Sequence, residues 1–257
     1  MRYHEDQGPP LFTYAALAAF IAFFGAEYQR FDLSRFYAYP WRVGDGEIWR
    51  LVTCTFLHAG ILHIAFNAIL FVRFCTVVDN WLGPWVALVF YVFVSLSSNA
   101  AELLLDRGVG VVGASGVVYG LFGFLWVMAR RRDDAAEAAN TQIVQTMLGW
   151  LAICAVINFF GGSIANAAHI VGLALGWMVG QTVVARKKWR IPMALATLVV
   201  WAIPLVFIQP KVWDRTLAYI PPLNRYYPHH VSEEMRQAYE DPANAPDVGL
   251  ISGSRHR

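Results

Sequence analysis

One serine and one histidine stand in separate apolar segments of this chain, and together they could perform nucleophilic chemistry. Ser115 lies between Ala114 and Gly116, and His169 lies some fifty residues further on. A histidine that activates a serine hydroxyl is a common device of acyl transfer. A lone serine or histidine in an apolar segment more often forms a hydrogen bond to its own helix or to a polar neighbour. The pair therefore indicates a catalytic site only if the surrounding elements bring the two side chains together.

The composition indicates that these elements are membrane-spanning helices. Of 257 residues, 57% are hydrophobic and only 15% are charged, whereas a soluble domain carries about 25% charged residues. The apolar residues form long blocks, and about 20 residues cross the hydrocarbon core as a helix. The sequence therefore predicts an all-α polytopic membrane bundle. Its seven blocks run approximately over Leu11–Tyr28, Ile61–Val78, Pro84–Leu105, Ala114–Ala129, Ile143–Phe160, Asn166–Ala185 and Ile191–Ile208.

Basic residues in two short loops predict the orientation. Arg130–Arg132 follows the fourth block and Arg186–Arg190 follows the sixth, so both clusters lie on one face. The positive-inside rule makes that face cytoplasmic. We therefore expect the N-terminus inside and the residues after Lys211 outside. The lack of a transit-like N-terminal segment favours a bacterial plasma membrane, with a eukaryotic membrane left open.

Ser115 and His169 are predicted to lie at a similar depth on parallel helices. They precede their basic clusters by about 15 and about 17 residues, or roughly 22 and 26 Å at 1.5 Å per residue. The core is about 30 Å thick, so both lie just below the outer surface.

Small residues on the same two helices predict a close approach, since they let membrane helix backbones touch. The stripe on the sixth block is Ala168, Gly172, Gly176 and Gly180, and that on the fourth is Gly116 and Gly120 with Gly113 and Gly123 nearby. Ser115 and His169 each stand beside one stripe. Such stripes alone indicate only that helices pack together. Here they predict that the side chains of Ser115 and His169 come within hydrogen-bonding distance of each other.

The second block adds candidate donors to the site. His63 and Asn67 are four residues apart and share one helix face at the same outer level. With the Ser115 backbone amide, and the Ala114 amide as a further candidate, they could stabilise the oxyanion of acyl transfer. The alternative is that they only tie helices together. No acidic residue adjoins His169 in sequence, so Tyr119 is the candidate that packs against its ring.

These residues resemble those of the rhomboid family of intramembrane serine proteases. The resemblance covers roughly residues 49–180. It rests on several motifs in order, namely Trp49-Arg50, His58 with His63 and Asn67, Gly113-Ala114-Ser115-Gly116 with Tyr119, and Ala168-His169 with Gly172 and Gly176. Ala167 and Val171 stand near His169, where members of the family often carry glycine or another small residue, and Val171 is expected to loosen the packing there slightly.

The resemblance implies a six-helix core with a Ser–His dyad that opens to the extracytoplasmic side, here with a seventh C-terminal transmembrane helix. It implies that transmembrane protein substrates in the bilayer are cut near their outer ends, without a metal or another cofactor. The fifth block, with Trp150, Phe159 and Phe160, would be the mobile gate. Residues 29–56 are rich in aromatic side chains and are expected to lie in the membrane interface or to form a cap.

Residues 1–210 are accordingly predicted to form a rhomboid-like transmembrane protease domain, and residues 211–257 a polar, weakly structured tail. The histidines at 229 and 230 are expected to be solvated. Cys54, Cys75 and Cys154 have no metal or disulfide spacing and are expected in the core. The net charge of +2 does not favour a nucleic-acid partner.

Two other functions stay open. An inactive rhomboid-like protein would bind membrane clients without cutting them, although such relatives typically lose the serine or the histidine. A transporter or channel would carry polar residues across the bilayer midplane. Here the polar residues of the third block, Ser95 to Asn99, fall in its outer half.

Overall fold

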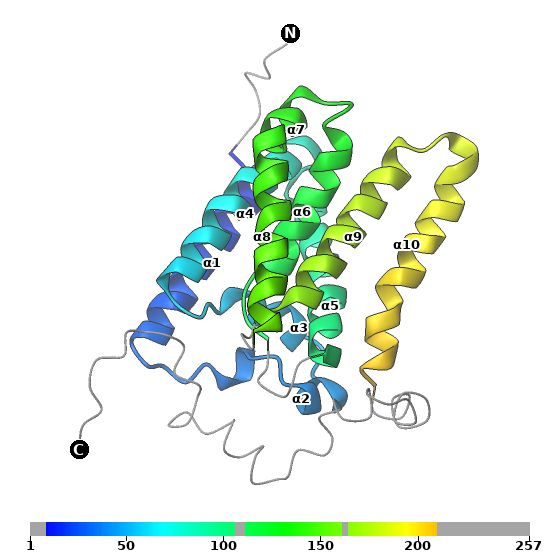
Figure 1. Ribbon diagram of the computed structural model, residues 1–257. Coiled ribbons are helices and arrows are strands. Elements are labelled where there is room, and N and C mark those ends of the chain that lie inside the picture. The colour runs from blue at the N-terminus through cyan, green and yellow to red at the C-terminus, as the bar shows by residue number, and fades with distance from the viewer. Residues whose placement is uncertain (1–8, 106–110, 161–163, 210–257) are drawn as a thin grey trace, which may run out of the picture.

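The computed structural model describes residues 9–105, 111–160 and 164–209, and these parts of the chain are helical (Figure 1). The long helices are α1 (Leu11–Tyr28), α4 (Ile61–Leu82), α5 (Pro84–Leu105), α6 (Ser115–Met128), α8 (Thr141–Phe159), α9 (Asn166–Val184) and α10 (Lys187–Phe207). The short elements are η1 (Ser34–Phe36), α2 (Pro40–Gly44), α3 (Arg50–Thr53), η2 (Cys54–Phe56) and α7 (Asp133–Ala138). The predicted boundary at residue 210 and the predicted tail lie outside the described residues.

Six of these helices, α1, α4, α5, α8, α9 and α10, are long and apolar enough to cross a membrane. The prediction of an all-α, multi-pass membrane bundle is therefore confirmed. The seventh long helix, α6, has 14 residues, or about 21 Å at 1.5 Å per residue. This is shorter than the roughly 30 Å of a typical hydrocarbon core.

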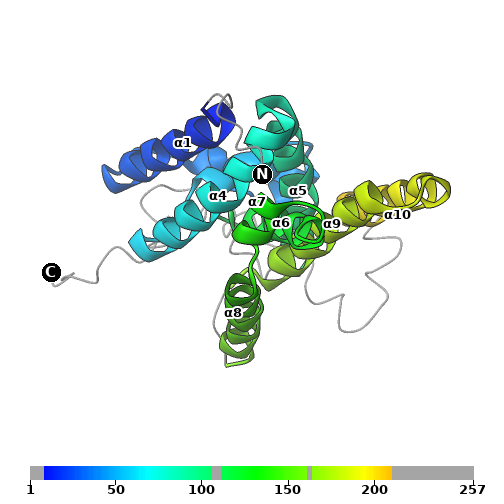
Figure 2. The same cartoon turned by 90° about the horizontal axis from the view of Figure 1, so that it is seen from above.

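Helix α6 lies at the centre of the bundle, as the view from above shows (Figure 2). All of its residues except Ser115 and Trp126 are buried. In contrast, α8 and α10 lie at the periphery, and each buries only two side chains, Met147 and Cys154 in α8 and Thr197 and Pro204 in α10. The apolar side chains that α8 and α10 leave exposed are suited to contact lipid.

The packing of α6 against α9 is the most extensive in the bundle. A Cβ atom added to Gly172 would collide with the carbonyl oxygen of Gly116, and one added to Gly176 would collide with that of Gly120. The two backbones therefore touch without intervening side chains. This is the close approach that the small-residue stripes predicted.

One glycine assigned to the stripe was placed wrongly by the sequence analysis. Gly113 precedes α6 and adopts φ +105°, a region that L side chains rarely occupy. It faces His63 of α4 rather than α9. Gly123, by contrast, does lie against the α9 backbone at Leu173 and Trp177.

The segment between α1 and α4 contains stacked aromatic rings and is joined to the chain ahead of α6. Tyr39 and Trp41 are buried and stacked, with ring centroids 4.9 Å apart, whereas Trp49 is 55% exposed. The segment reaches the chain ahead of α6, because the Val111 N–H donates to the Ala38 carbonyl at 3.2 Å. The predicted choice between an interfacial segment and a cap stays open.

Gly176→Ala is predicted to destabilise the bundle, because the new methyl group would force α6 and α9 apart. Such overpacking costs about 1–3 kcal/mol, so the midpoint of thermal unfolding in detergent should fall. Gly149→Ala is the matched control, since a Cβ there meets nothing within 4 Å and alanine favours the helix. An unchanged midpoint for Gly176→Ala would contradict the backbone contact.

Candidate active site

Ser115 and His169 lie within hydrogen-bond distance across the α6–α9 contact. The Ser115 Oγ and the His169 Nε2 are 2.8 Å apart. Ser115 is the first residue of α6, and His169 lies in the first turn of α9. The N-terminal ends of α6 and α9 therefore supply one partner each. The glycine contacts between the two helices fix the distance between them. A serine in this geometry can transfer its proton to a neutral imidazole.

The ring of His169 is buried and is held by packing. It is 3% exposed and lies against Tyr119, with ring centroids 4.7 Å apart. The Tyr119 hydroxyl donates to the Met147 carbonyl of α8 at 2.9 Å. Among the described residues, no hydrogen-bond partner reaches the His169 Nδ1. Among the described residues, the imidazole is therefore held by the packing of Tyr119 and by its contact with Ser115, and not by an acidic partner of the Nδ1.

Two candidate donors of α4 face the chain just ahead of Ser115. The His63 Nδ1 accepts the Ala59 N–H at 3.1 Å, so the neutral ring carries its proton on Nε2. A Cβ on Gly113 would lie 2.7 Å from that Nε2 and 3.6 Å from the Asn67 Nδ2. The Asn67 Nδ2 is buried and has no hydrogen-bond partner among the described residues. Both N–H groups are thus available to an acceptor at this point.

The backbone ahead of α6 also contributes to this arrangement. Gly113 N–H donates to the Cys54 carbonyl at 3.0 Å, which anchors the turn. The Ser115 amide belongs to the first turn of α6, whose N–H groups have no partner within the helix. The Ser115 amide is therefore a backbone donor without a partner in its own helix, two residues after the glycine that faces His63 and Asn67.

His58, a residue of the histidine-rich motif, supports the site from the loop before α4. Its ring packs edge-on against Phe20 and His63, with centroids 5.3 and 5.2 Å away. Burial, with a smaller contribution from His63, lowers the pKa of His58 to about 3. The ring is therefore neutral at physiological pH and adds no positive charge beside His63.

A cavity of about 730 Å³ joins these side chains. Ser115, His169, His63, Asn67 and Tyr119 all line it, together with apolar residues of α4 and α8. Such a mostly apolar cavity with a few convergent polar groups is typical of a binding site. In the described part of the chain, no group of three or more potential ligands could hold a metal ion.

The structure adds one residue that the sequence analysis missed. Glu102 of α5 lines the same cavity, and its Oε2 accepts the Ala168 N–H at 3.0 Å. The acceptor therefore meets the first turn of α9 directly before His169. A single carboxyl in an apolar block is itself a signal of function, but the sequence does not say which helix it meets.

Six helices suited to cross a membrane, with a serine and a histidine paired between two helices, define a multi-pass membrane protein with a candidate serine nucleophile. Comparison with known proteins agrees with this class. A family model described as the rhomboid domain matches residues 45–186. The chain belongs to the rhomboid family.

Two relatives illustrate the similarity. The rhomboid protease GlpG of Yersinia enterocolitica is 33% identical over 133 residues, which are 52% of this chain and 47% of that protein. The rhomboid protease GlpG of Enterobacter sp. is 31% identical over 189 residues, or 72% of this chain and 67% of that protein. The chain therefore spans about half to two thirds of the length of these relatives.

Glu102→Ala is predicted to loosen the first turn of α9, because the Ala168 N–H loses a carboxyl acceptor at a helix N-terminus. Such acceptors contribute about 1 kcal/mol, so the midpoint of thermal unfolding should fall. Glu102→Gln keeps an oxygen acceptor, so its midpoint should fall less. Equal midpoints for Glu102→Ala and the unchanged protein would contradict this role.

Proposed function

We propose that this chain is an intramembrane serine endopeptidase that hydrolyses peptide bonds in or near the outer ends of transmembrane helices. The observation that carries the proposal is the 2.8 Å approach of the Ser115 Oγ to the His169 Nε2 at the wall of the cavity. The protease names of the relatives support the same reaction at the level of the family. The reaction needs no metal or other cofactor, because the two side chains supply both nucleophile and base.

The proposed reaction has two halves. The His169 Nε2 accepts the proton of Ser115 while the Oγ attacks the scissile carbonyl carbon, and the imidazolium then protonates the leaving amine. A water molecule, deprotonated by the same nitrogen, hydrolyses the acyl-enzyme and restores the serine. Tyr119 keeps the ring in position through both steps, since it packs on its face.

The negative charge of the tetrahedral intermediate is proposed to rest on four donors. These are the Ser115 backbone N–H, the His63 Nε2–H, the Asn67 side-chain amide and, as a further candidate, the Ala114 backbone N–H. The neutral His63 tautomer and the unpartnered Asn67 Nδ2 favour this role. Donors fixed in a site from which water is largely excluded act more strongly than they would in water.

The proposed arrangement in the membrane follows the charge of the loops. Helices α1, α4, α5, α6, α8 and α9 form a six-span core, and α10 is a seventh span, all within residues 1–210. The site opens to the extracytoplasmic side of a bacterial plasma membrane, because Arg130–Arg132 and Arg186–Arg190 mark the opposite end. Substrates are proposed to enter past α8, whose packing on its neighbours is limited.

The competing function is client binding without cleavage. It would use the same cavity but would not need Ser115 to be reactive. The two functions therefore differ in the chemistry of one hydroxyl, and that hydroxyl can be tested directly.

Ser115→Ala and His169→Ala are each predicted to abolish cleavage of a transmembrane reporter helix by the reconstituted protein, since either change removes half of the dyad. The folded bundle should persist, because both changes leave the glycine contacts intact. Ser95→Ala is the matched control, as Ser95 is a buried serine that donates to its own helix at Tyr91. Full cleavage by Ser115→Ala would overturn the mechanism. A protein that neither cleaves nor labels Ser115 with a fluorophosphonate probe would be a client binder.

His63→Ala and Asn67→Ala are each predicted to lower kcat about 10²-fold, which is typical of the loss of one oxyanion donor. KM should change little, because the donors act on charge that develops in the transition state. Measured kcat and KM for the same reporter would test this. A rise in KM with an unchanged kcat would instead assign these residues to substrate binding.

A further inference from the structure

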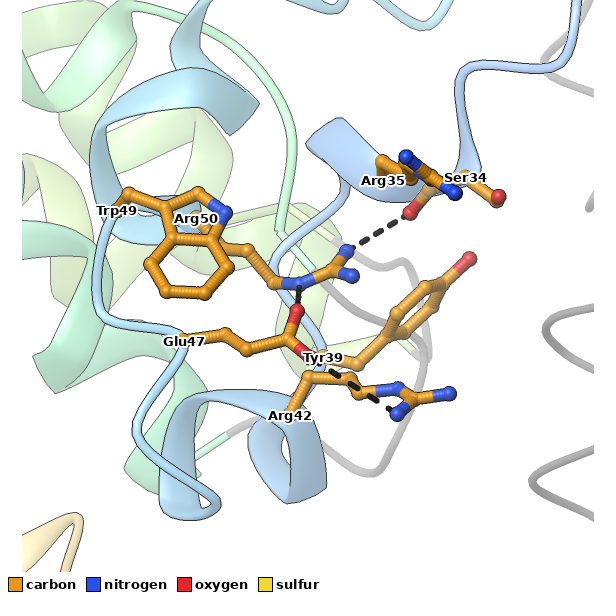
Figure 3. A pocket seen from close by; sticks show the side chains of 7 residues that line it. All are labelled: Ser34, Arg35, Tyr39, Arg42, Glu47, Trp49 and Arg50. Carbon is orange, nitrogen blue, oxygen red and sulfur yellow. Dashed lines mark hydrogen bonds and ion pairs between the residues drawn. The ribbon is translucent and has the colours of Figure 1, made fainter.

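A cavity of about 560 Å³ lies in the segment between α1 and α4, and hydrogen bonds within the protein occupy polar groups of its lining (Figure 3). There the Arg50 guanidinium pairs with Glu47 and donates to the carbonyl oxygens of Ser34 and Tyr37 at 2.8 and 2.9 Å. Arg50 thereby ties the segment together. The cavity that holds Ser115 differs, because polar side chains at its far end are not used in this way.

The cavity of Ser115 and His169 continues past the dyad along α8. Its α8 lining runs from Cys154 back to Gln145, a stretch of about 14 Å at 1.5 Å per residue. Asn166, the first residue of α9, donates to the Cys154 carbonyl at 3.0 Å. Cys154 therefore lies at the end of α9 that carries His169, and Gln145 lies at the far end of the cavity. No step of the proposed hydrolysis takes place there.

Two adjacent polar side chains, Gln145 and Thr146, line this far end, and both residues are exposed. The Thr146 hydroxyl donates to the Gln142 carbonyl at 2.9 Å, so its oxygen can still accept a hydrogen bond. Within the described chain, no hydrogen bond reaches the Gln145 amide. Helix α8 is suited to cross a membrane, where a polar group without a partner is costly and indicates function. The two side chains are therefore available to a polar partner within the bilayer.

The cavity is open to the outside of the bundle beside α8. Phe66 of α4 and Trp150 of α8 line it and stack on each other, with ring centroids 6.0 Å apart. These two residues are nevertheless 59% and 47% exposed, so they do not close the cavity off. A helical segment that enters past α8 and presents a peptide bond to Ser115 would therefore run beside Gln145 and Thr146.

The spacing between Ser115 and this polar end sets a register for such a segment. Tyr119 lies about 6 Å beyond Ser115 along α6, and Gln145 lies about 3 Å before Met147 along α8. The Tyr119 hydroxyl donates to the Met147 carbonyl at 2.9 Å, which joins the two levels. Gln145 thus lies roughly 9 Å beyond Ser115 along the bundle. A substrate covers this distance with about three extended or about six helical residues.

We propose that Gln145 and Thr146 select transmembrane substrates that carry an amide side chain, asparagine or glutamine, about three to six residues to the membrane side of the cleaved bond. This inference rests on the proposed function and names the substrate class of the same site. An amide both donates and accepts, so it can pair with the Gln145 amide and donate to the Thr146 oxygen. Because an unpaired amide is costly in lipid, the cavity would stabilise the substrate helix that carries it.

The test measures binding of labelled reporter helices to the full chain with Ser115→Ala in proteoliposomes, by energy transfer, so it does not depend on proteolysis. One asparagine is moved position by position through an otherwise apolar reporter. We expect a window of positions at which asparagine binds about three- to tenfold more tightly than leucine, as hydrogen bonds between membrane helices do. Gln145→Leu and Thr146→Val should each reduce this preference, and the double change should abolish it.

Gln142→Leu is the matched control, since it removes the same amide from α8 at a position that does not line the cavity, and it should keep the full preference. The proposal is overturned if no position favours asparagine, if the double variant keeps the preference, or if the control loses it as well. An unreactive Ser115 hydroxyl together with an intact preference would overturn the proposed function and leave the selection of substrates standing.

Discussion

The contact between the backbones of α6 and α9 is the constraint on which the geometry of the site depends. A side-chain hydrogen bond weakens within a few tenths of an ångström of displacement, so the helices that carry Ser115 and His169 need a fixed separation. At Gly172 and Gly176 that separation is set by main-chain atoms in contact. Main-chain atoms cannot change rotamer, so the contact leaves less freedom than side-chain packing would.

Two polar side chains that line the cavity differ from a polar group that joins two helices. The Asp79 carboxylate of α4 accepts hydrogen bonds from the backbone N–H and the hydroxyl of Thr13. These bonds join α1 to α4 and give the buried carboxylate its partners. Asn67 and His169, in contrast, each keep a buried nitrogen without a partner among the described residues. Such atoms raise the free energy of the folded state. The side chains of Asn67 and His169 both line the space where a substrate carbonyl is proposed to sit.

Much of this arrangement could be predicted from the sequence, because block length and glycine spacing are local properties. The apolar blocks predicted the helices, and the four-residue spacing of Gly172 and Gly176 predicted the close approach. The position of Gly113 could not be predicted in the same way, because its φ of +105° depends on contacts with α4 and with Cys54. The contact of Glu102 with α9 was missed for the same reason, since residues far apart in sequence make it.

The attachment of α8 has a consequence for how this protein can vary. Tyr119 donates to the Met147 carbonyl, and Asn166 donates to the Cys154 carbonyl at 3.0 Å. Both acceptors are main-chain atoms, which every residue type provides. The side chains of α8 that face away from the bundle are therefore not needed for its attachment. Their identities can drift during evolution and adapt the helix to other lipids, while α6 and α9 keep their glycines.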